Sequence, residues 1–215
     1  YISVRVTLAD GRVQTRQYTL NDSTPSRRTF TVRRLDEGMV SPVLAGRTRV
    51  GQTLMISDPF GDVGALEGDG PLVLATAGIG CTPAAAILRA LADSGSTREV
   101  LVAHADQSLR SWALRSRMEA DVRALPNARL RVWLARREEG DDPGVAEVMD
   151  GRLDVVGLRA RPGATVFLCG PVPFMDSMRL QLAVVGVPDS DIRYEAFGPD
   201  LWRERGEAPT QDRFR

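Results

Sequence analysis

The sequence contains no lysine and only one histidine, His104, among its 215 residues. All 28 basic residues are arginines, which excludes Schiff-base lysine chemistry and the lysine-dependent phosphate loop of nucleoside triphosphatases. The single histidine and the two cysteines, Cys81 and Cys169, cannot supply an all-Cys/His zinc site or a four-cysteine iron–sulfur cluster. We therefore expect no metal site, and any redox cofactor held by this chain should be organic.

Net charge and long apolar runs are also missing. The 28 basic and 28 acidic residues cancel, so no global field favours nucleic acid as a partner. No apolar run reaches the roughly 18 residues needed to span a bilayer, and no signal-peptide pattern opens the chain. The two cysteines do not form a Cys-x-x-Cys pair, which is typical of separate reduced thiols. We expect a cytoplasmic protein with no membrane or nucleic-acid partner.

The first part of the chain, residues 1–64, has the pattern of an all-β domain. Apolar and polar residues alternate in short segments, and Gly, Asp and Pro separate them. The expected strands cover residues 1–8, 12–20, 27–35 and 53–56. Residues 38–44 could form a short helix. This spacing predicts a small antiparallel barrel or sandwich.

From Gly70 onward, strands alternate with helices. The expected strands cover residues 72–76, 99–103, 129–135, 165–168 and 191–196. The expected helices cover 83–92, part of 108–124, and 172–185, with weaker helical or irregular segments at 144–150 and 153–158. This alternation predicts a doubly wound parallel sheet over residues 65–199, with ligands at the carboxyl ends of its strands. Residues 200–215 should form an irregular tail.

One turn in this second part has the features of a nucleotide-binding loop. The apolar run 72–76 leads into Gly78-Ile79-Gly80-Cys81-Thr82-Pro83 and then into a helix. Glycines let the backbone approach a pyrophosphate, and a helix N-terminus offers it N–H donors. Pro83 stands where the usual fingerprint has its third glycine, so the turn alone is equally compatible with a purely structural role.

Three other motifs lie on or directly after predicted strands. They are Arg16-Gln17-Tyr18-Thr19 on a predicted strand, Cys169-Gly170-Pro171 after another strand, and Tyr194-Glu195-Ala196-Phe197-Gly198-Pro199 near the end. On a strand, Arg16 and Tyr18 share one face while Thr19 points the other way. Each motif alone also has a purely structural explanation. The first fits ordinary barrel surface, the second fits a core cysteine beside a turn, and the third fits a last strand closed by a Gly-Pro turn.

In this order and spacing the motifs resemble the ferredoxin–NADP reductase superfamily, and in particular the reductase portion of flavohaemoglobins. The resemblance extends from residue 1 to about residue 199. Arg16–Thr19 is similar to the family's Arg-x-Tyr-Ser/Thr flavin motif, and Gly38-Met39-Val40-Ser41 is similar to its pyrophosphate-binding Gly-x-Val-Ser. Residues 78–83 and 169–171 resemble the two pyridine-nucleotide motifs, and 194–199 resembles the closing Tyr-Glu-x-Phe-Gly-Pro.

The resemblance implies FAD as the cofactor of residues 1–64. Tyr18 would lie against the flavin ring, Arg16 would neutralise the pyrophosphate, and Thr19 would hydrogen-bond the flavin at N5, with Gln17 beside them. Backbone N–H groups around Val40 and Ser41, together with the Ser41 hydroxyl, would hold phosphate.

The resemblance implies NAD(P)H as the ligand of residues 65–199. The residues that would bind it are Gly78, Gly80, Cys81, Thr82, Pro83, Cys169, Gly170 and Pro171. Cys169 would lie near the nicotinamide, Phe197 would shield the flavin ring, and Glu195 would take part in proton transfer. Tyr18, Thr19, Cys169 and Glu195 are the candidate catalytic residues, acting mainly by positioning and electrostatics.

Two departures from the family pattern bear on these expectations. Cys81 stands where the flavohaemoglobin branch usually has Gln, so the placement of the dinucleotide can differ. The family barrel also begins with strands upstream of Tyr1, so we expect these 215 residues to be part of a longer polypeptide.

Nucleotide preference is expected to depend on residues after the predicted strands 99–103 and 129–135. The carboxylate of Asp106 would suit a free ribose hydroxyl and repel a 2′-phosphate. Arg136 and Arg137, after the predicted strand 129–135, would instead favour the 2′-phosphate of NADPH. The two arginines also fit a solvated charge cluster. We expect NADH to be favoured and NADPH to be tolerated, with His104 as a packed or hydrogen-bonded structural residue.

The leading functional hypothesis is an FAD-containing NAD(P)H reductase that passes single electrons to haem in a globin domain, as in nitric oxide dioxygenation by flavohaemoglobins. An alternative is a reductase component that supplies an iron–sulfur or haem oxygenase partner. A third is a scaffold that binds flavin or nucleotide for sensing and transfers no hydride.

Overall fold

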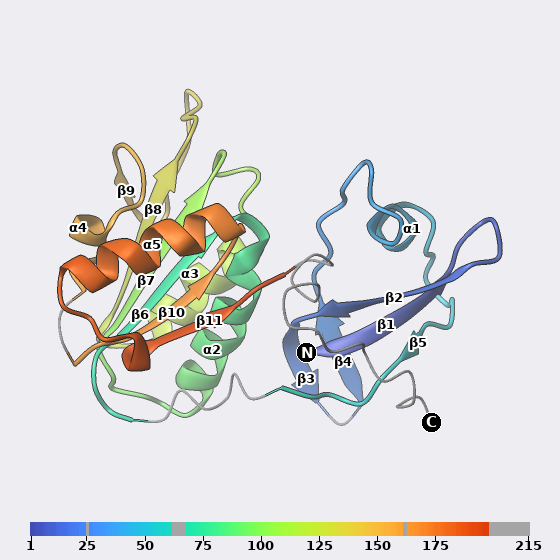
Figure 1. Ribbon diagram of the computed structural model, residues 1–215, viewed down its shortest axis with the longest axis horizontal. Helices are drawn as coiled ribbons and strands as arrows, with labels where there is room; N and C mark the ends of the chain where they lie inside the picture. Colours follow the sequence, from blue (N-terminus) through green and yellow to red (C-terminus); the bar gives the residue numbers. More distant parts are fainter. Residues whose placement is uncertain (25, 62–67, 161–162, 198–215) are drawn as a thin grey trace. The chain divides into compact units, whose positions relative to one another are not determined.

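The structure is a computed structural model that describes residues 1–24, 26–61, 68–160 and 163–197. The described residues form two compact units, one within residues 1–61 and one within residues 68–197. Figure 1 labels the elements of both units. The irregular tail expected over 200–215 and the Gly198-Pro199 end of the last motif lie outside the described residues.

The first unit is built on antiparallel strands. β1 (Ile2–Thr7) lies between β2 (Val13–Tyr18) and β5 (Met55–Ile56), while β3 (Leu20–Thr24) pairs with β4 (Arg27–Phe30). Gly11, at φ +83°, lies in the turn that joins β1 to β2, where its missing Cβ removes the strain of a positive φ. The helix α1 (Ser41–Gly46) completes the unit.

A small apolar core holds this unit together. Alternate residues of β1 are buried, as period-two alternation requires, and Val40 joins them from the segment before α1. Partly buried residues pack around this core: Tyr18, Leu20, Phe30, Val43 and Leu44.

The second unit contains a six-stranded parallel sheet in the order β11-β10-β6-β7-β8-β9. The strands are β6 (Leu72–Ala77), β7 (Val100–Asp106), β8 (Ala128–Leu134), β9 (Glu147–Met149), β10 (Thr165–Cys169) and β11 (Ile192–Glu195). From β6 the chain adds strands on one side as far as β9, and then adds β10 and β11 on the other side. The order therefore reverses between β6 and β10.

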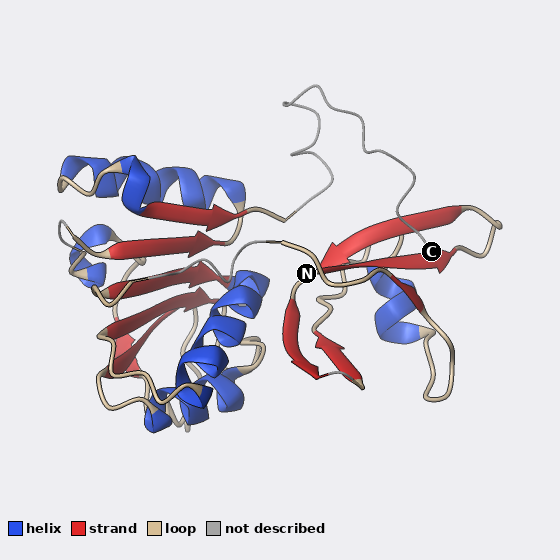
Figure 2. Ribbon diagram, turned by 90° about the horizontal axis from the view of Figure 1, so that it is seen from below, coloured by secondary structure: helices blue, strands red, loops and turns tan. Residues whose placement is uncertain are grey.

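Helices cover both faces of this sheet (Figure 2). They are α2 (Cys81–Asp93), α3 (Arg115–Ala124), α4 (Val155–Leu158) and α5 (Val172–Val184), with short 3₁₀ turns at Gly78–Gly80 and Asp189–Asp191. α4 and α5 share one core with Val73, Ala75 and Trp133 of the strands. Because side chains alternate along a strand, Thr76 and the residues in register with it face the other side.

The structure confirms the predicted fold class, with antiparallel sheets followed by a parallel sheet that carries helices on both faces. Most predicted elements are present with slightly different ends. The helix expected over 172–185 is α5, and Gly186, with φ +80°, follows its end.

Two local expectations were wrong or incomplete. β3 was not expected, because Leu20–Thr24 is largely polar and shows no apolar alternation. β9 lies in the segment 144–150 that was expected to be helical or irregular; it is held by pairing with β8 and by an ion pair of 2.8 Å between Arg131 and Glu147. The helix expected within 108–124 is present as α3, which begins at Arg115 after a loop.

Across the described ranges, no helix is both long enough and apolar enough to cross a membrane.

Candidate functional site

The carboxyl edge of the parallel sheet brings two sequence motifs together. β6 ends at Ala77 and continues through the turn Gly78–Gly80 into α2, while its neighbour β10 ends at Cys169 and continues into Gly170. This is the place where the strand order reverses. Crevices at such switch points are the usual ligand sites of doubly wound sheets.

Glycine is required here because the two chain segments are very close. A Cβ atom on Gly80 would lie 2.3 Å from the carbonyl oxygen of Cys169. A Cβ atom on Gly170 would lie 2.9 Å from Cδ1 of Phe174 and 3.0 Å from Cβ of Ala77. Gly78 has φ +54°, a conformation that side chains rarely adopt. Because these glycines have no side chains, the turn can pack directly against the end of β10.

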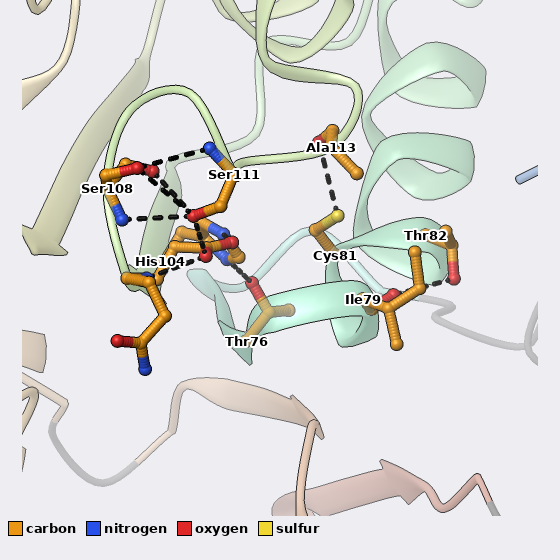
Figure 3. Close-up of polar contacts among 10 residues, drawn as sticks. Thr76, Ile79, Cys81, Thr82, His104, Ser108, Ser111 and Ala113 are labelled. Atoms are coloured by element: carbon orange, nitrogen blue, oxygen red, sulfur yellow. Dashed lines mark hydrogen bonds and ion pairs between the residues drawn. The ribbon is translucent and has the colours of Figure 1, made fainter. Parts of the chain in front are cut away.

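The start of α2 stabilises this turn from within. The Thr82 hydroxyl donates to the carbonyl oxygen of Ile79 at 3.1 Å, and Thr82 is buried. The Cys81 thiol donates to the carbonyl oxygen of Ala113 at 3.3 Å (Figure 3). Pro83 lies in the first turn, where a missing N–H removes no helical hydrogen bond. The backbone N–H of Cys81 donates to the carbonyl oxygens of Gly78 and Ile79, so the first turn of α2 continues directly from the glycine turn.

Four polar side chains form a row across this edge of the sheet. In the strand register, Glu195 is opposite Cys169, Cys169 is opposite Thr76, and Thr76 is opposite His104. Residues in register on parallel strands point to the same face, so the row lies on the side away from α4 and α5. We call these four residues the polar row.

His104 is completely buried and hydrogen-bonded at both ring nitrogens. Its Nδ1 lies 2.8 Å from the Thr76 hydroxyl, and its Nε2 lies 3.2 Å from a carboxylate oxygen of Asp106. Because the carboxylate only accepts hydrogen bonds, Nε2 carries the proton and Nδ1 accepts from Thr76. Burial lowers the pKa of His104, although Asp106 acts in the opposite direction. The ring is therefore neutral, and the expected structural role of His104 agrees with its contacts.

Asp106 does not present its carboxylate to a ligand. Its side chain is 3% exposed and accepts from Ser111 Oγ at 2.6 Å and from the backbone N–H of Gln107 at 2.7 Å. Burial raises its pKa, but the hydrogen bonds from His104, Ser111 and Gln107 outweigh it and the net pKa is lowered. The argument that Asp106 recognises a ribose hydroxyl is therefore wrong, because the carboxylate is occupied inside the loop.

The two arginines after β8 differ in their surroundings. Arg137 donates to Asp150 at 2.8 Å, while the Arg136 side chain is exposed and its backbone N–H donates to Gln107 at 2.8 Å. The carboxylates of Glu138, Glu139, Asp141 and Asp142 follow directly in the chain. This segment has more negative than positive charge.

Both cysteines are buried free thiols. Burial raises the pKa of Cys81 to about 12, with a smaller contribution from the charge of Asp106. Burial also raises the pKa of Cys169, followed by the charge of Glu195 and the nearby Cys81. Both groups stay protonated near neutral pH, so Cys169 is a neutral, compact side chain and not a thiolate nucleophile.

In the first unit, the Arg16–Thr19 segment lies on β2 and just after it. Arg16 donates to Gln14 Oε1 at 3.2 Å and to the carbonyl oxygen of Thr15 at 2.8 Å. The Tyr18 ring packs on Phe30 with 5.2 Å between centroids, and burial raises the pKa of its phenol. Gln17 is exposed and Thr19 is half-buried. Tyr18 is thus a protonated phenol on an aromatic support.

The Gly38–Ser41 segment forms a compact turn into α1. The Ser41 hydroxyl oxygen accepts from the Leu35 N–H at 3.1 Å, and a Cβ atom on Gly38 would lie 2.7 Å from that oxygen. Val40 is 2% exposed and belongs to the core of the unit. A hydroxyl group can accept and donate at the same time, so Ser41 can still donate its hydrogen while its oxygen accepts from the Leu35 N–H.

The end of the last strand is more exposed. Tyr194 and Phe197 are exposed, and the Arg179 guanidinium lies 5.2 Å from the centre of the Tyr194 ring. Glu195 is half-buried beside Cys169.

Within the second unit, the structure brings Gly78, Gly80 and Cys81 together with Cys169, Gly170 and Glu195. Sequence reasoning missed the loop of residues 107–114, because no motif marks Ser111 or Trp112. Its only signal was the His104-Ala105-Asp106 run at a strand end, which was interpreted as a ligand contact. No group of three or more His, Cys, Asp or Glu side chains that could hold a metal ion occurs within the described part of the chain.

The family model of the oxidoreductase NAD-binding domain matches residues 74–180. The flavohemoprotein of Bordetella pertussis is 35% identical over 208 residues, which cover 92% of this chain and 52% of the relative. The flavohemoprotein of Chromobacterium violaceum is 35% identical over 210 residues, covering 92% of this chain and 52% of the relative. The chain thus spans about half the length of the curated relatives it matches.

Solved structures show the same similarity. The flavohem-like FAD/NAD-binding domain of nitric oxide dioxygenase from Vibrio cholerae O1 biovar El Tor matches with a TM-score of 0.80 and 30% identity, covering 93% of this chain and 84% of that one. Flavohemoglobin from Malassezia yamatoensis, with bound FAD and heme, matches with a TM-score of 0.82 and 35% identity, covering 91% of this chain and 50% of that one.

Proposed function

Because this chain belongs to the ferredoxin reductase-like superfamily, in the branch of the flavohaemoglobin reductase domains, we propose that it is an FAD-dependent NAD(P)H oxidoreductase module. The observation that carries this proposal is the turn Gly78–Gly80. It is fixed against Cys169 at the switch point of the sheet, within the segment that matches an NAD-binding domain.

The second unit fits a dinucleotide. Gly78 and Gly80 carry no side chain, so the backbone of the turn can approach a pyrophosphate, and the start of α2 supplies a positive dipole end. Cys169 would contact the nicotinamide. Its raised pKa keeps it uncharged there, so it can pack against a ring without placing a negative charge beside it.

The first unit fits a flavin. The Arg16 guanidinium would bind the pyrophosphate, and the protonated Tyr18 phenol would donate to a flavin hydroxyl while its ring stays supported by Phe30. Thr19 and Ser41 each offer a hydroxyl donor. When bound, FAD takes a hydride from reduced nicotinamide and passes its electrons on singly. The residues of this chain would bind and orient the two cofactors and exclude water.

We propose NADH as the preferred dinucleotide. The support is the local charge after β8, where Arg137 is paired with Asp150 and four carboxylates follow it. This excess of negative charge opposes a 2′-phosphate, as like charges repel. Arg136 remains exposed and would allow NADPH to bind more weakly.

We propose haem in a globin domain as the electron acceptor and nitric oxide dioxygenation as the overall reaction, in the cytoplasm. The support is similarity to curated relatives named flavohemoprotein and to a domain described as part of nitric oxide dioxygenase.

The test is anaerobic absorbance of the purified chain loaded with FAD. One equivalent of NADH should bleach the flavin band at about 450 nm. Adding two equivalents of a ferric haem globin, each haem accepting one electron, should then restore the oxidised flavin spectrum. Flavin that stays oxidised while both ligands bind would support a sensing scaffold and contradict the proposal, and bleaching without electron transfer to haem would contradict only the proposed acceptor.

A further inference from the structure

We propose that His104 is a positioning residue that joins the glycine turn Gly78–Gly80 to the loop of residues 107–114 and thereby holds the turn in its dinucleotide-binding geometry. This inference rests on the proposed function. It concerns a side chain that is completely buried and cannot itself reach a ligand.

The first connection between the loop and the turn runs through His104. Thr76, two residues before Gly78, donates to His104, which donates to Asp106, and Asp106 accepts from Ser111 of the loop. Figure 3 shows this chain of contacts running from β6 into the loop. Every polar atom of the His104 ring is used in it. The interaction is therefore directional and fixes the end of β6 relative to the loop.

The second connection lies on the other side of the turn. Cys81, the residue after Gly80, donates its thiol hydrogen to Ala113 of the same loop at 3.3 Å. The glycine turn is thus held on both sides: the loop is linked through Asp106 and His104 to Thr76, two positions before the turn, and contacts Cys81 directly after it (Figure 3). Neither contact alone would fix both ends of a three-residue turn.

The loop needs this support because it has no regular backbone pairing of its own. It ends at Leu114, which has φ +60°, an unfavourable conformation for a non-glycine residue. Trp112 anchors it by stacking on the His104 ring, with 5.0 Å between centroids and 28° between planes. The Trp112 side chain is buried, and its Nε1 has no hydrogen-bond partner among the described residues, so packing and not a polar contact holds it.

A near-isosteric substitution tests the first connection. Thr76→Val removes the hydroxyl that donates to His104 and keeps the branched shape of the side chain. Thr165→Val, at the amino end of the neighbouring strand β10, is the matched control, because it makes the same change at the opposite edge of the sheet. The probe is NAD⁺, titrated by calorimetry into the FAD-loaded chain.

We expect Thr76→Val to raise the dissociation constant of NAD⁺ about fivefold, the change that corresponds to one neutral hydrogen bond. Thr165→Val should leave it within twofold of wild type. Amide hydrogens of residues 107–114 should exchange faster in Thr76→Val and not in the control. FAD affinity should not change in either variant, because the residues proposed to hold FAD on β2 and at the start of α1 lie in the other unit.

A second variant tests whether the contacts of Thr76 and Ser111 are energetically coupled through His104. Ser111→Ala removes the hydroxyl that donates to Asp106, together with its hydrogen bonds to the Ser108 backbone, without touching Thr76 or His104. If the connection through His104 is real, the double variant should weaken NAD⁺ binding by less than the product of the two single effects.

The outcomes separate this inference from the proposed function. Wild-type chain that fails to bind NAD⁺ overturns both. Wild-type chain that binds NAD⁺, with Thr76→Val equal to Thr165→Val in affinity and in exchange, overturns the positioning role and leaves the proposed function standing. If the double variant weakens NAD⁺ binding by the full product of the two single effects, the connection through His104 is also overturned.

Discussion

The substitution Gly80→Ala tests the packing of the glycine turn with a single added methyl group. The new Cβ would lie 2.3 Å from the Cys169 carbonyl oxygen, 2.6 Å from its carbonyl carbon and 2.8 Å from the Gly170 nitrogen. These are backbone atoms, so they cannot rotate away. Gly80 has φ −62°, which alanine adopts freely, so any effect comes from the collision and not from backbone strain.

The size of the effect follows from these distances. Ordinary contact begins at 3.4 Å, so the turn and the end of β10 must separate by about 1 Å. Overpacking of this kind costs about 1–3 kcal/mol of folding stability. A misplacement of about 1 Å in a reacting complex can lower a rate by about 100-fold. We expect weaker NADH binding and slower flavin reduction, measured by anaerobic stopped-flow absorbance, with stability measured by urea unfolding.

Two other glycines provide the controls. Gly46→Ala adds a methyl group with no atom within 4 Å and should leave NADH binding unchanged. Gly157→Ala places a Cβ 2.3 Å from Trp133 Cζ2, away from the turn, so it should lower stability without a specific effect on NADH. The reasoning is refuted if Gly80→Ala binds and oxidises NADH within twofold of wild type, or if its defect is no larger than that of Gly157→Ala.

Three further predictions concern backbone strain, thiol protection and pH. Arg159 is exposed with φ +48°, so Arg159→Gly should raise the free energy of unfolding by about 0.5–1 kcal/mol in urea titrations; an unchanged or lower value would contradict this. The raised pKa of Cys81, about 12, and the burial of Cys169 predict that a thiol reagent at pH 8 modifies neither residue until the chain unfolds, and labelling of the native chain would refute it. Burial lowers the pKa of His104 below its usual 6.5, so the unfolded chain binds this proton more readily and stability should fall as pH decreases below 6.5. His104 is the only histidine, so His104→Gln should reduce this slope between pH 6.5 and 5; an unchanged slope would show that His104 does not cause it.

The sequence predicted the fold class well because the two units follow different and strong local patterns. Alternation in 1–8 marks β1, and the continuous apolar run 72–76 marks a strand covered on both faces. β9 could not be predicted, because Glu147–Met149 is only three residues long and is defined by pairing with β8. Short strands of this kind depend on tertiary contacts more than on local pattern.

The candidate site was only partly predictable for a similar reason. Glycine spacing indicated the turn, since close backbone approach can only be met by glycine. Asp106 was misassigned because a carboxylate at a strand end looks the same in sequence whether it faces a ligand or a neighbouring side chain. Its partners, Ser111 and the His104 ring, are identified only by the folded loop. The roles proposed for Tyr18, Thr19, Ser41 and Glu195 stay predictions.

The most direct test of the central claim is anaerobic reduction of the FAD-loaded chain by NADH that carries deuterium at the transferred position of the nicotinamide. We expect the flavin band at about 450 nm to bleach and deuterium to slow the bleaching, because a C–H bond breaks in that step. A flavin that binds beside NADH and keeps its band, with either isotope, would contradict the claim that this chain is a reductase.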